Sequence, residues 1–302
     1  MRVLVAGASG VVGRPLVGAL RARGHRVSAL VRDASRAPEA DEVVVADALD
    51  RSSVLTAVSA ARPEVVVHQL SALSLLGDDP AEAFARTARL RTEGTRHLVE
   101  AVRACGARRL VAQSIAFAAA PAGPDVLDEH APLYLDAPDP GWAATVRAVA
   151  VLEELVQGVQ GVVLRYGALY GPGTVYARAG GTGQRVLAGR LPLPSGGAGV
   201  TSFLHVEDAV GAAVRAVESE AFGVFHVTDD EPAAAVQWLP HYAKALGAPA
   251  PRVVPEALAP RLLGWFTAHQ LTAARGADNS RASVTLGWRP RRPSWREGLG
   301  EE

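Results

Sequence analysis

Short apolar runs alternate with segments of helical spacing over the first half of the chain. The apolar runs that read as strands cover residues 2–6, 25–31, 42–46, 64–69, 109–114 and 162–166. Between them, apolar positions recur at helical intervals over residues 14–23, 52–61, 81–105 and 142–157. This order of strand, helix and strand is typical of a parallel sheet buried between helices.

The pattern changes after Gly171-Pro172-Gly173, where glycine, proline and scattered aromatics replace the regular alternation. Helical spacing remains only in short segments such as 206–218 and 237–246. We predict an α/β fold: a Rossmann-like doubly wound parallel sheet over residues 1–170 and a smaller substrate-binding lobe over 171–302, with some segments interleaved. The proline- and aspartate-rich segment 118–144 is predicted as a long connection, either a substrate-contacting loop or a solvated one.

Composition and charge narrow the class of protein. Hydrophobic residues make up 49% of the chain, and one cysteine, Cys105, excludes an internal disulfide. Lys plus Arg and Asp plus Glu both total 31, so the basic excess that favours nucleic-acid binding is absent. No apolar run reaches the roughly 18 residues needed to cross a bilayer, and the histidines lack metal-ligand spacing. We expect a cytoplasmic protein that binds no nucleic acid, membrane or metal.

Three glycines, Gly7, Gly10 and Gly13, recur at regular intervals between the first predicted strand and the first predicted helix. Such glycines permit a tight turn and a close approach of the backbone to a pyrophosphate, which the positive end of the following helix attracts. The context of strand, turn, helix and strand therefore predicts a dinucleotide site. Its predicted contacts in this turn are Gly7, Ser9, Gly10, Val11, Val12 and Gly13.

Arg32 stands at the end of the second predicted strand, where a carboxylate would accept from the adenosine ribose of NAD. A guanidinium matches a phosphate and cannot accept from hydroxyls, so Arg32 favours NADP(H), with NAD(H) still possible. Asp33 follows and either caps the next segment or contacts ribose. Asp47, with Ala48 beside it, is placed to accept from the adenine amino group or to cap a helix.

Several motifs resemble the extended short-chain dehydrogenase/reductase family, the group of NAD-dependent epimerases and dehydratases. Besides the glycine turn, they are His68-Gln69-Leu70-Ser71-Ala72, Glu93-Gly94-Thr95, Ala112-Gln113-Ser114, Leu164 to Gly173, Phe203 to Asp208, and Leu286-Gly287-Trp288-Arg289-Pro290. The resemblance spans nearly the whole chain. It implies that Leu70, Ser71 and Ala72 pass under the cofactor, and that the protein pairs as a homodimer through the helices predicted at 81–105 and 142–157.

The resemblance fails where the family places its proton-transfer residues. Members carry Tyr-x-x-x-Lys on the helix after the serine strand; if Glu153 is aligned with the glutamate that closes this helix, Thr145 and Val149 take those positions. Lys244 is the only lysine, and none of the five tyrosines has a lysine four positions later. A threonine hydroxyl is too weak an acid, and valine supplies neither charge nor donor.

Ser114 is the best remaining catalytic candidate, because it ends the strand that faces the nicotinamide in such folds. Its hydroxyl either donates to a substrate oxygen or caps a turn. Tyr134, in a proline-bounded loop, either replaces the missing acid or anchors the loop; with a pKa near 10, it would need a large shift to act as a base at pH 7. Thr145, at the position of the missing tyrosine, completes the predicted catalytic set.

Substrate contacts are predicted for Arg165, Tyr166 and Tyr170, together with Ser114. Arg165 binds either the substrate or a structural carboxylate. The asparagine that contacts the diphosphate of nucleotide-sugar substrates in related enzymes is replaced by Ala168, which argues against such a substrate here. In the second-lobe motif, His205 and Asp208 are expected to fix the geometry of the lobes more than to act in catalysis.

We therefore predict an NAD(P)-dependent oxidoreductase that acts on a small, partly apolar carbonyl or hydroxyl compound, with a non-standard proton donor. Hydride transfer is mainly the chemistry of the cofactor, while the protein supplies orientation and a hydrogen-bond donor. Two alternatives stay open. One is an epimerase, dehydratase or cyclase that uses the nucleotide without net redox change, and the other is a non-catalytic protein that senses NADP(H).

Overall fold

A seven-stranded parallel sheet forms the centre of the molecule in a computed structural model, which describes residues 1–73 and 80–300. The strand order is β12-β7-β5-β4-β1-β2-β3, and every pair in this sheet is parallel. The strands are β1 (Arg2–Ala6), β2 (Arg26–Val31), β3 (Glu42–Val45), β4 (Val65–His68), β5 (Arg109–Ile115), β7 (Val162–Tyr166) and β12 (Gly223–Val227). The order reverses between β1 and β4, and open α/β sheets bind ligands at the carboxyl ends of the strands beside such a point.

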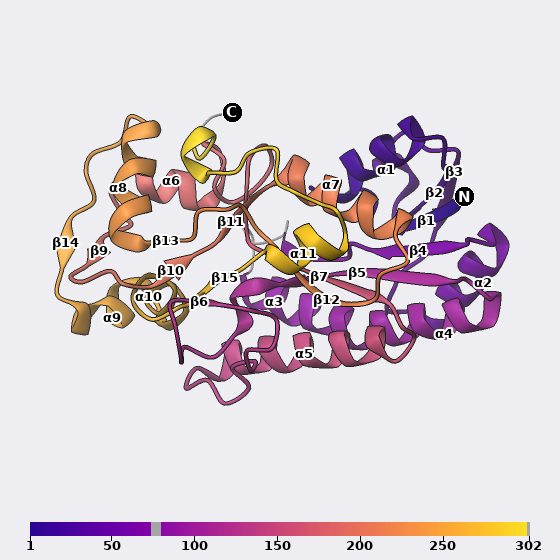
Figure 1. Cartoon of the computed structure of the whole chain (residues 1–302), viewed down its shortest axis with the longest axis horizontal. Coiled ribbons are helices and arrows are strands. Elements are labelled where there is room, and N and C mark those ends of the chain that lie inside the picture. Colours follow the sequence, from indigo (N-terminus) through magenta and orange to yellow (C-terminus); the bar gives the residue numbers. More distant parts are fainter. Residues whose placement is uncertain (74–79, 301–302) are drawn as a thin grey trace.

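Helices cover both faces of this sheet (Figure 1). One face packs against α1 (Gly13–Ala22) and α7 (Val206–Glu218), and the other against α2 (Arg51–Ala61), α4 (Thr95–Cys105) and α5 (Pro140–Gln157). Because both faces are buried, the central strands are apolar almost throughout, as in β4, whose four residues are all buried. The predicted α/β fold with a doubly wound parallel sheet is therefore confirmed.

The one or two long helices predicted over 81–105 are two helices joined by a wider turn. Helix α3 (Pro80–Arg89) leads into a π-helical turn over Leu90–Gly94, and α4 follows directly. The hydroxyl of Thr95 donates to the carbonyl of Leu90 at 3.4 Å, across the widened turn. Since π-helical turns are rare and gather at functional sites, this interruption draws attention to the residues on it.

A smaller lobe stands at one end of the sheet (Figure 1). Its core contains the aromatic residues Phe203, Trp238, Tyr242 and Trp295, which are all buried. Its helices are α6 (Gly181–Leu187), α8 (Ala235–Ala245), α9 (Ala259–Leu263) and α10 (Trp265–Thr272). Its short strands pair in twos: β8 (Ala168–Tyr170) with β11 (Phe203–His205), β9 (Leu193–Pro194) with β14 (Val253–Val254), and β10 (Val200–Thr201) with β13 (Ala233–Ala234).

The two lobes exchange segments. Strand β12 and helix α7 come after residue 171 in the chain but belong to the large sheet and its covering layer. In the other direction, β6 (Val126–Leu127), from the long connection before α5, pairs with β15 (Gly276–Ala277) near the C-terminus. Helix α11 (Ser280–Thr285) then packs back beside β12. None of the helices in the described residues is long and apolar enough to span a membrane.

Candidate active site

The turn after β1 has the geometry that a dinucleotide needs. Gly7 adopts φ +85°, and a methyl group there would lie 2.6 Å from the carbonyl oxygen of Gln69. A methyl group on Gly13 would collide with the carbonyl oxygen of Gly7, so the start of α1 packs directly on the turn. No side chain among the described residues caps α1, and Gly10 and Val11 are exposed. Among the described residues, the amides of Val11, Val12 and Gly13 have no backbone partner and are available to a phosphate.

The carboxyl end of β2 presents a positive charge. Arg32 is exposed, while Asp33 accepts from the backbone and hydroxyl of Ser35 at 2.9 and 2.8 Å and caps the next turn. These hydrogen bonds lower the pKa of Asp33 and occupy one of its oxygens. Arg14 of α1 donates to the carbonyl of Arg36 at 2.7 Å. Two further arginines therefore lie close to the carboxyl end of β2. Asp33 thus takes the capping role left open by the sequence, and the site is cationic.

The segments after β3 and β4 also meet at this edge of the sheet. Asp47 accepts from the backbone of Leu49 at 3.0 Å and lies 3.6 Å from the guanidinium of Arg86, so its carboxylate is partly engaged in a turn. Ala48 is buried, with its carbonyl 2.9 Å from Nδ1 of His97.

The predicted contacts after β4 differ in exposure. Leu70 accepts from Gln113 at 3.1 Å, Ser71 is exposed, and Ala72 is buried with its amide on Thr87. All three lie at the carboxyl end of β4, beside the glycine turn, where they were expected. Their contact with a cofactor stays a prediction.

Ser114 belongs to a buried charged network. Its hydroxyl donates to Oε1 of Glu153 on α5 at 2.8 Å, and the guanidinium of Arg165 on β7 donates to both oxygens of the same carboxylate at 2.9 and 2.7 Å. Glu153 and Arg165 are 4% and 5% exposed. Arg165 therefore binds a structural carboxylate, one of the two roles that the sequence left open. The role of Ser114 toward a substrate stays a prediction.

The network continues into the long connection before α5. Arg165 donates to the carbonyl of Glu129 at 3.4 Å, and a carboxylate oxygen of Glu129 accepts from the backbone of His226 on β12 at 2.7 Å. Burial, and secondly the charge of Arg165, lower the pKa of His226 to about 4, so this imidazole is neutral near pH 7. The connection is thereby tied to the sheet at two adjacent strands.

The positions aligned with the missing proton-transfer pair lie on the buried face of α5. Thr145 is 8% exposed, and its hydroxyl donates to the carbonyl of Gly141 at 3.0 Å within the same helix. Val149 is fully buried in an apolar cluster. Since the proton of Thr145 is already used, neither position offers an acid or a base.

Tyr134 stands in an aromatic cluster between the two lobes. Its ring lies 6.3 Å from Trp265 and 5.6 Å from His269, both on α10, and those two rings stack on each other. Nearby, Trp142 of α5 packs against Phe266 with 4.7 Å between ring centroids. This setting fits the anchoring role as well as the catalytic one, and the catalytic role stays a prediction.

Two of the predicted substrate contacts are in the core. Tyr166 is 2% exposed, with its hydroxyl between Gln69 and the carbonyl of Ala209, and Tyr170 is fully buried against Phe203. Burial raises the pKa of both phenols. Strand alternation points Tyr166 away from α5 and into the layer under α7, and Tyr170 belongs to the core of the smaller lobe. Their positions favour packing over contact with a substrate.

The residues of the second-lobe motif fix the geometry between lobes, as expected. His205 caps α7 by accepting from the backbone of Glu207 at 3.2 Å. The carboxylate of Asp208 accepts from the backbone amides of Arg291 and Arg292 at 2.7 and 3.1 Å. Through these bonds the C-terminal segment is held onto the start of α7.

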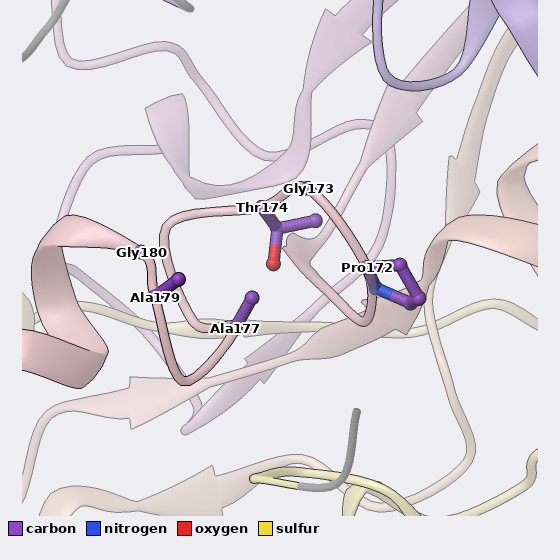
Figure 2. A pocket seen from close by; sticks show the side chains of 6 residues that line it. All are labelled: Pro172, Gly173, Thr174, Ala177, Ala179 and Gly180. Carbon is purple, nitrogen blue, oxygen red and sulfur yellow. The ribbon is translucent and has the colours of Figure 1, made fainter.

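A cavity of about 390 Å³ lies in the turn after β8 (Figure 2). Its lining residues are Pro172, Gly173, Thr174, Ala177, Ala179 and Gly180, none of which is charged. A methyl group on Gly173 would lie 3.6 Å from the side chain of Val11, so the cavity adjoins the glycine turn. The cavity beside the glycine turn therefore has small, uncharged walls.

One charged residue near this edge was missed by the sequence interpretation. Arg91, on the π-helical turn, is 8% exposed, and no hydrogen bond or ion pair joins it to the described residues. Its position in the helical repeat could have identified it, because Arg91 falls on the same face as Thr87 and Leu98, and that face is buried. A lone arginine among the core positions of a helix is rarely tolerated without a partner.

The fold and the glycine turn agree with comparisons to known proteins. The model of the NAD dependent epimerase/dehydratase family matches residues 3–227, and the chain belongs to this family. A Streptomyces protein called 3-diazoavenalumate denitrifying reductase is 80% identical over 304 aligned residues, which cover 100% of both chains. The predicted family resemblance is thus confirmed, and the chain is an enzyme of the oxidoreductase or epimerase type.

Solved structures place the fold in the same group. UDP-glucose 4-epimerase from Thermotoga maritima, solved with UDP-glucose, has a TM-score of 0.77 at 23% identity, covering 99% of this chain and 96% of that one. UDP-glucose 4-epimerase from Thermus thermophilus, in complex with NAD, has a TM-score of 0.70 at 26% identity, with the same coverage. A nicotinamide dinucleotide cofactor is accordingly supported for this chain.

Proposed function

We propose that the chain is an NADPH-dependent reductase that replaces the diazo group of a carboxylate substrate with hydrogen and releases dinitrogen. The 80% identity to a 3-diazoavenalumate denitrifying reductase, over the full length of both chains, supports this reaction and this class of substrate. The observation that carries the proposal lies in the site itself: a dinucleotide-binding turn is combined with positions 145 and 149 that supply no acid or base.

The chemistry of a diazonium group explains why an acid is unnecessary. Reduction of a carbonyl needs a hydride on carbon and a proton on oxygen, so an enzyme normally provides an acid near neutral pH. A diazonium cation, R–N₂⁺, that accepts a hydride gives R–H and N₂. The carbon–nitrogen bond breaks, its electron pair leaves with dinitrogen, and no proton is consumed. Loss of the tyrosine and lysine is therefore no obstacle to this reaction.

The cofactor supplies the hydride when bound, and the chain supplies binding and orientation. The amides of Val11, Val12 and Gly13 would hold the pyrophosphate. Arg32, with Arg14 and Arg36 nearby, would hold the 2′-phosphate of NADPH. Leu70, Ser71 and Ala72 would lie along the cofactor at the end of β4.

For a flat substrate, the small-walled cavity after β8 and the aromatic residues Tyr134 and Trp265 offer apolar surfaces. Ser114 and Thr145 would border the reacting carbon from β5 and α5. Their hydroxyl protons are donated to Glu153 and to the carbonyl of Gly141, so toward the substrate their oxygens would act as acceptors and would exchange no proton with it.

Isotope transfer tests the proposal directly. The purified enzyme is given an aromatic diazonium carboxylate labelled with ¹⁵N and NADPH deuterated at C4, and absorbance at 340 nm is followed with mass analysis of product and gas. We expect one ¹⁵N₂ and one deuterated product per NADPH oxidised. In D₂O with unlabelled NADPH, the carbon that lost nitrogen should carry no deuterium.

Three results would contradict the proposal. Product formed without net oxidation of NADPH would indicate an epimerase-like use of the cofactor. Binding of NADPH without any turnover would indicate a sensing role. Solvent deuterium at the reacting carbon would show that a proton, and not a hydride, is delivered there. A matched reaction with a ketone carboxylate should be at least about 10²-fold slower, because the ketone needs the missing acid.

A further inference from the structure

Arg91 is the most unusual charged residue in the described part of the chain. Its side chain is more than nine-tenths buried, and its guanidinium has no hydrogen-bond or ion-pair partner among the described residues. A guanidinium carries five N–H donors and stays charged in proteins. Burial lowers the pKa of Arg91 to about 10, so the group is still a cation at neutral pH. An unpaired buried cation is costly to the folded state and is usually completed by a partner.

The charge of Glu153 acts favourably on Arg91, but this carboxylate is already paired. One oxygen accepts from Ser114 and from Nε of Arg165, and the other accepts from Nη2 of Arg165. Glu153 therefore balances the charge of Arg165 and leaves the charge of Arg91 without a paired carboxylate among the described residues.

The neighbouring histidine is also unable to pair with Arg91. His68 accepts the backbone N–H of Leu70 at Nδ1, 3.2 Å away, so its proton sits on Nε2, which lies 3.0 Å from the hydroxyl of Thr95. Both ring nitrogens are thus used. Burial, and secondly the charge of Arg91, lower the pKa of His68 to about 4 and keep it neutral.

The position of Arg91 is the one where a ligand is expected. It influences His68, the last residue of β4, and its π-helical turn packs against α5, which carries Thr145 and Val149. Arg91 thus stands at the carboxyl edge of the sheet beside the switch between β1 and β4. The π-helical turn changes the register of the helix at this point, which sets Arg91 on the buried face.

We propose that Arg91 binds the carboxylate of the substrate and so orients it against the cofactor. The proposal rests on the proposed function only in taking the substrate to be a carboxylate. A carboxylate matches the planar fork of a guanidinium and neutralises its charge, whereas the ribose hydroxyls of a cofactor can accept but leave the charge in place. Substrate entry would thereby complete the charge balance of the site.

Comparing the binding of a carboxylate with that of its uncharged ester distinguishes carboxylate recognition by Arg91 from a role in cofactor binding or in the stability of the fold. Cinnamate and methyl cinnamate are titrated by calorimetry into the enzyme saturated with NADP⁺, using the wild type, Arg91→Gln, Arg91→Lys and the control Arg89→Gln. Arg89 lies on the same helix but is exposed and pairs with Glu93.

For Arg91→Gln we expect cinnamate to bind about tenfold or more weakly, as for loss of a charged hydrogen bond. Binding of the ester should be unchanged, and Arg91→Lys should recover part of the affinity. The Kd for NADPH should stay as in the wild type. The urea midpoint of the ligand-free Arg91→Gln protein should be equal or higher, because an unpaired buried charge is removed.

Other outcomes overturn the proposal. Equal weakening of acid and ester, or a weaker Kd for NADPH, would assign Arg91 to the cofactor site or to the scaffold. A lower urea midpoint would mean that Arg91 stabilises the fold through Glu153. Unchanged binding of cinnamate would leave Arg91 without a role in recognition. These measurements need no turnover, so they remain decisive even if the diazo reduction is not observed.

Discussion

Glu153 joins three elements of the candidate active site through a single carboxylate. Its oxygens accept from Ser114 on β5 and from Arg165 on β7, while the residue itself is on α5. Breaking a buried ion pair leaves a charge without compensation, which is much more costly than loss of a surface pair.

We expect Glu153→Gln to lower the free energy of unfolding by about 3–5 kcal/mol. The amide can still accept one hydrogen bond from Arg165 but cannot balance its charge. Urea denaturation measures the change, with Glu154→Gln on the exposed side of the same helix as the control. Equal midpoints for the two variants would show that the network contributes nothing to stability.

At the scale of single residues, the sequence could suggest whether a side chain has a structural or a substrate-binding role, but it could not show which atoms that side chain contacts. The alternative that Arg165 binds a structural carboxylate is what the structure shows. Tyr166 and Tyr170 were predicted to contact the substrate; strand alternation buries Tyr166 and the lobe core buries Tyr170, and their contact with a substrate stays a prediction. Arg91 was not identified from the sequence, because only the three-dimensional structure shows that it is buried without a hydrogen-bond or ion-pair partner among the described residues.

At the scale of elements, the turn after β1 depends on how closely α1 approaches it. Gly13→Ala would place a methyl group against the carbonyl oxygen of Gly7, whereas Gly18, on the same helix, has nothing within 4 Å of such a group. We expect Gly13→Ala to abolish NADPH binding in fluorescence titrations. Gly18→Ala should bind normally and be more stable by about 0.5–1 kcal/mol, the difference in helix propensity. Normal NADPH binding by Gly13→Ala would contradict the close approach.

The end of β2 sets the choice of cofactor in our proposal. Arg32→Glu should weaken NADPH by about 10- to 100-fold, as for loss of one charged hydrogen bond to a phosphate. Its effect on NADH should be small. Arg26→Glu makes the same change at the other end of the strand and should leave both Kd values unaltered. An unchanged ratio of the two Kd values in Arg32→Glu would exclude the 2′-phosphate contact.

Most elements of the large lobe could be predicted from periodicity alone. The run at 162–166 matches β7, and the segment at 206–218 matches α7. The seventh strand, β12, was not predicted, because its five residues stand in a region of glycine, proline and short elements where no alternation marks a strand. The π-helical turn at Leu90–Gly94 could not be predicted from the sequence either, because one extra residue in a helical turn barely alters the spacing of apolar positions.

At the scale of the whole molecule, two kinds of buried titratable group act in opposite directions on stability. His68 and His226 have pKa values of about 4 in the folded protein, below the ordinary value near 6.5, chiefly because burial disfavours their charged form. The buried carboxyl of Asp229 has a pKa raised to about 8, also mainly through burial. Histidine protonation therefore opposes folding in acid, and ionisation of Asp229 opposes folding as the pH rises.

We expect the stability of the protein to be greatest near pH 6–7. Between pH 6.5 and about 4, the unfolded chain binds protons at both histidines and the folded one does not, so each costs up to about 3 kcal/mol on acidification. Between about pH 4 and 8, the unfolded chain ionises Asp229 while the folded one keeps it protonated, so stability is lost as the pH rises.

Urea unfolding at half-unit intervals of pH measures this curve. Asp229→Asn should remove the decline between pH 6.5 and 8 while keeping the decline in acid. A maximum above pH 8 in the wild type would contradict these assignments.

The placement of β12 has a consequence for dissecting the protein. A fragment that stops at residue 170 would lose the outermost strand beside β7 and the helix α7 that shields one side, leaving Tyr166 and its apolar neighbours open to water. Such a half would aggregate and would not survive as a separate cofactor-binding unit. Heating should accordingly unfold both lobes in one transition, because each lobe contains segments from the other half of the sequence.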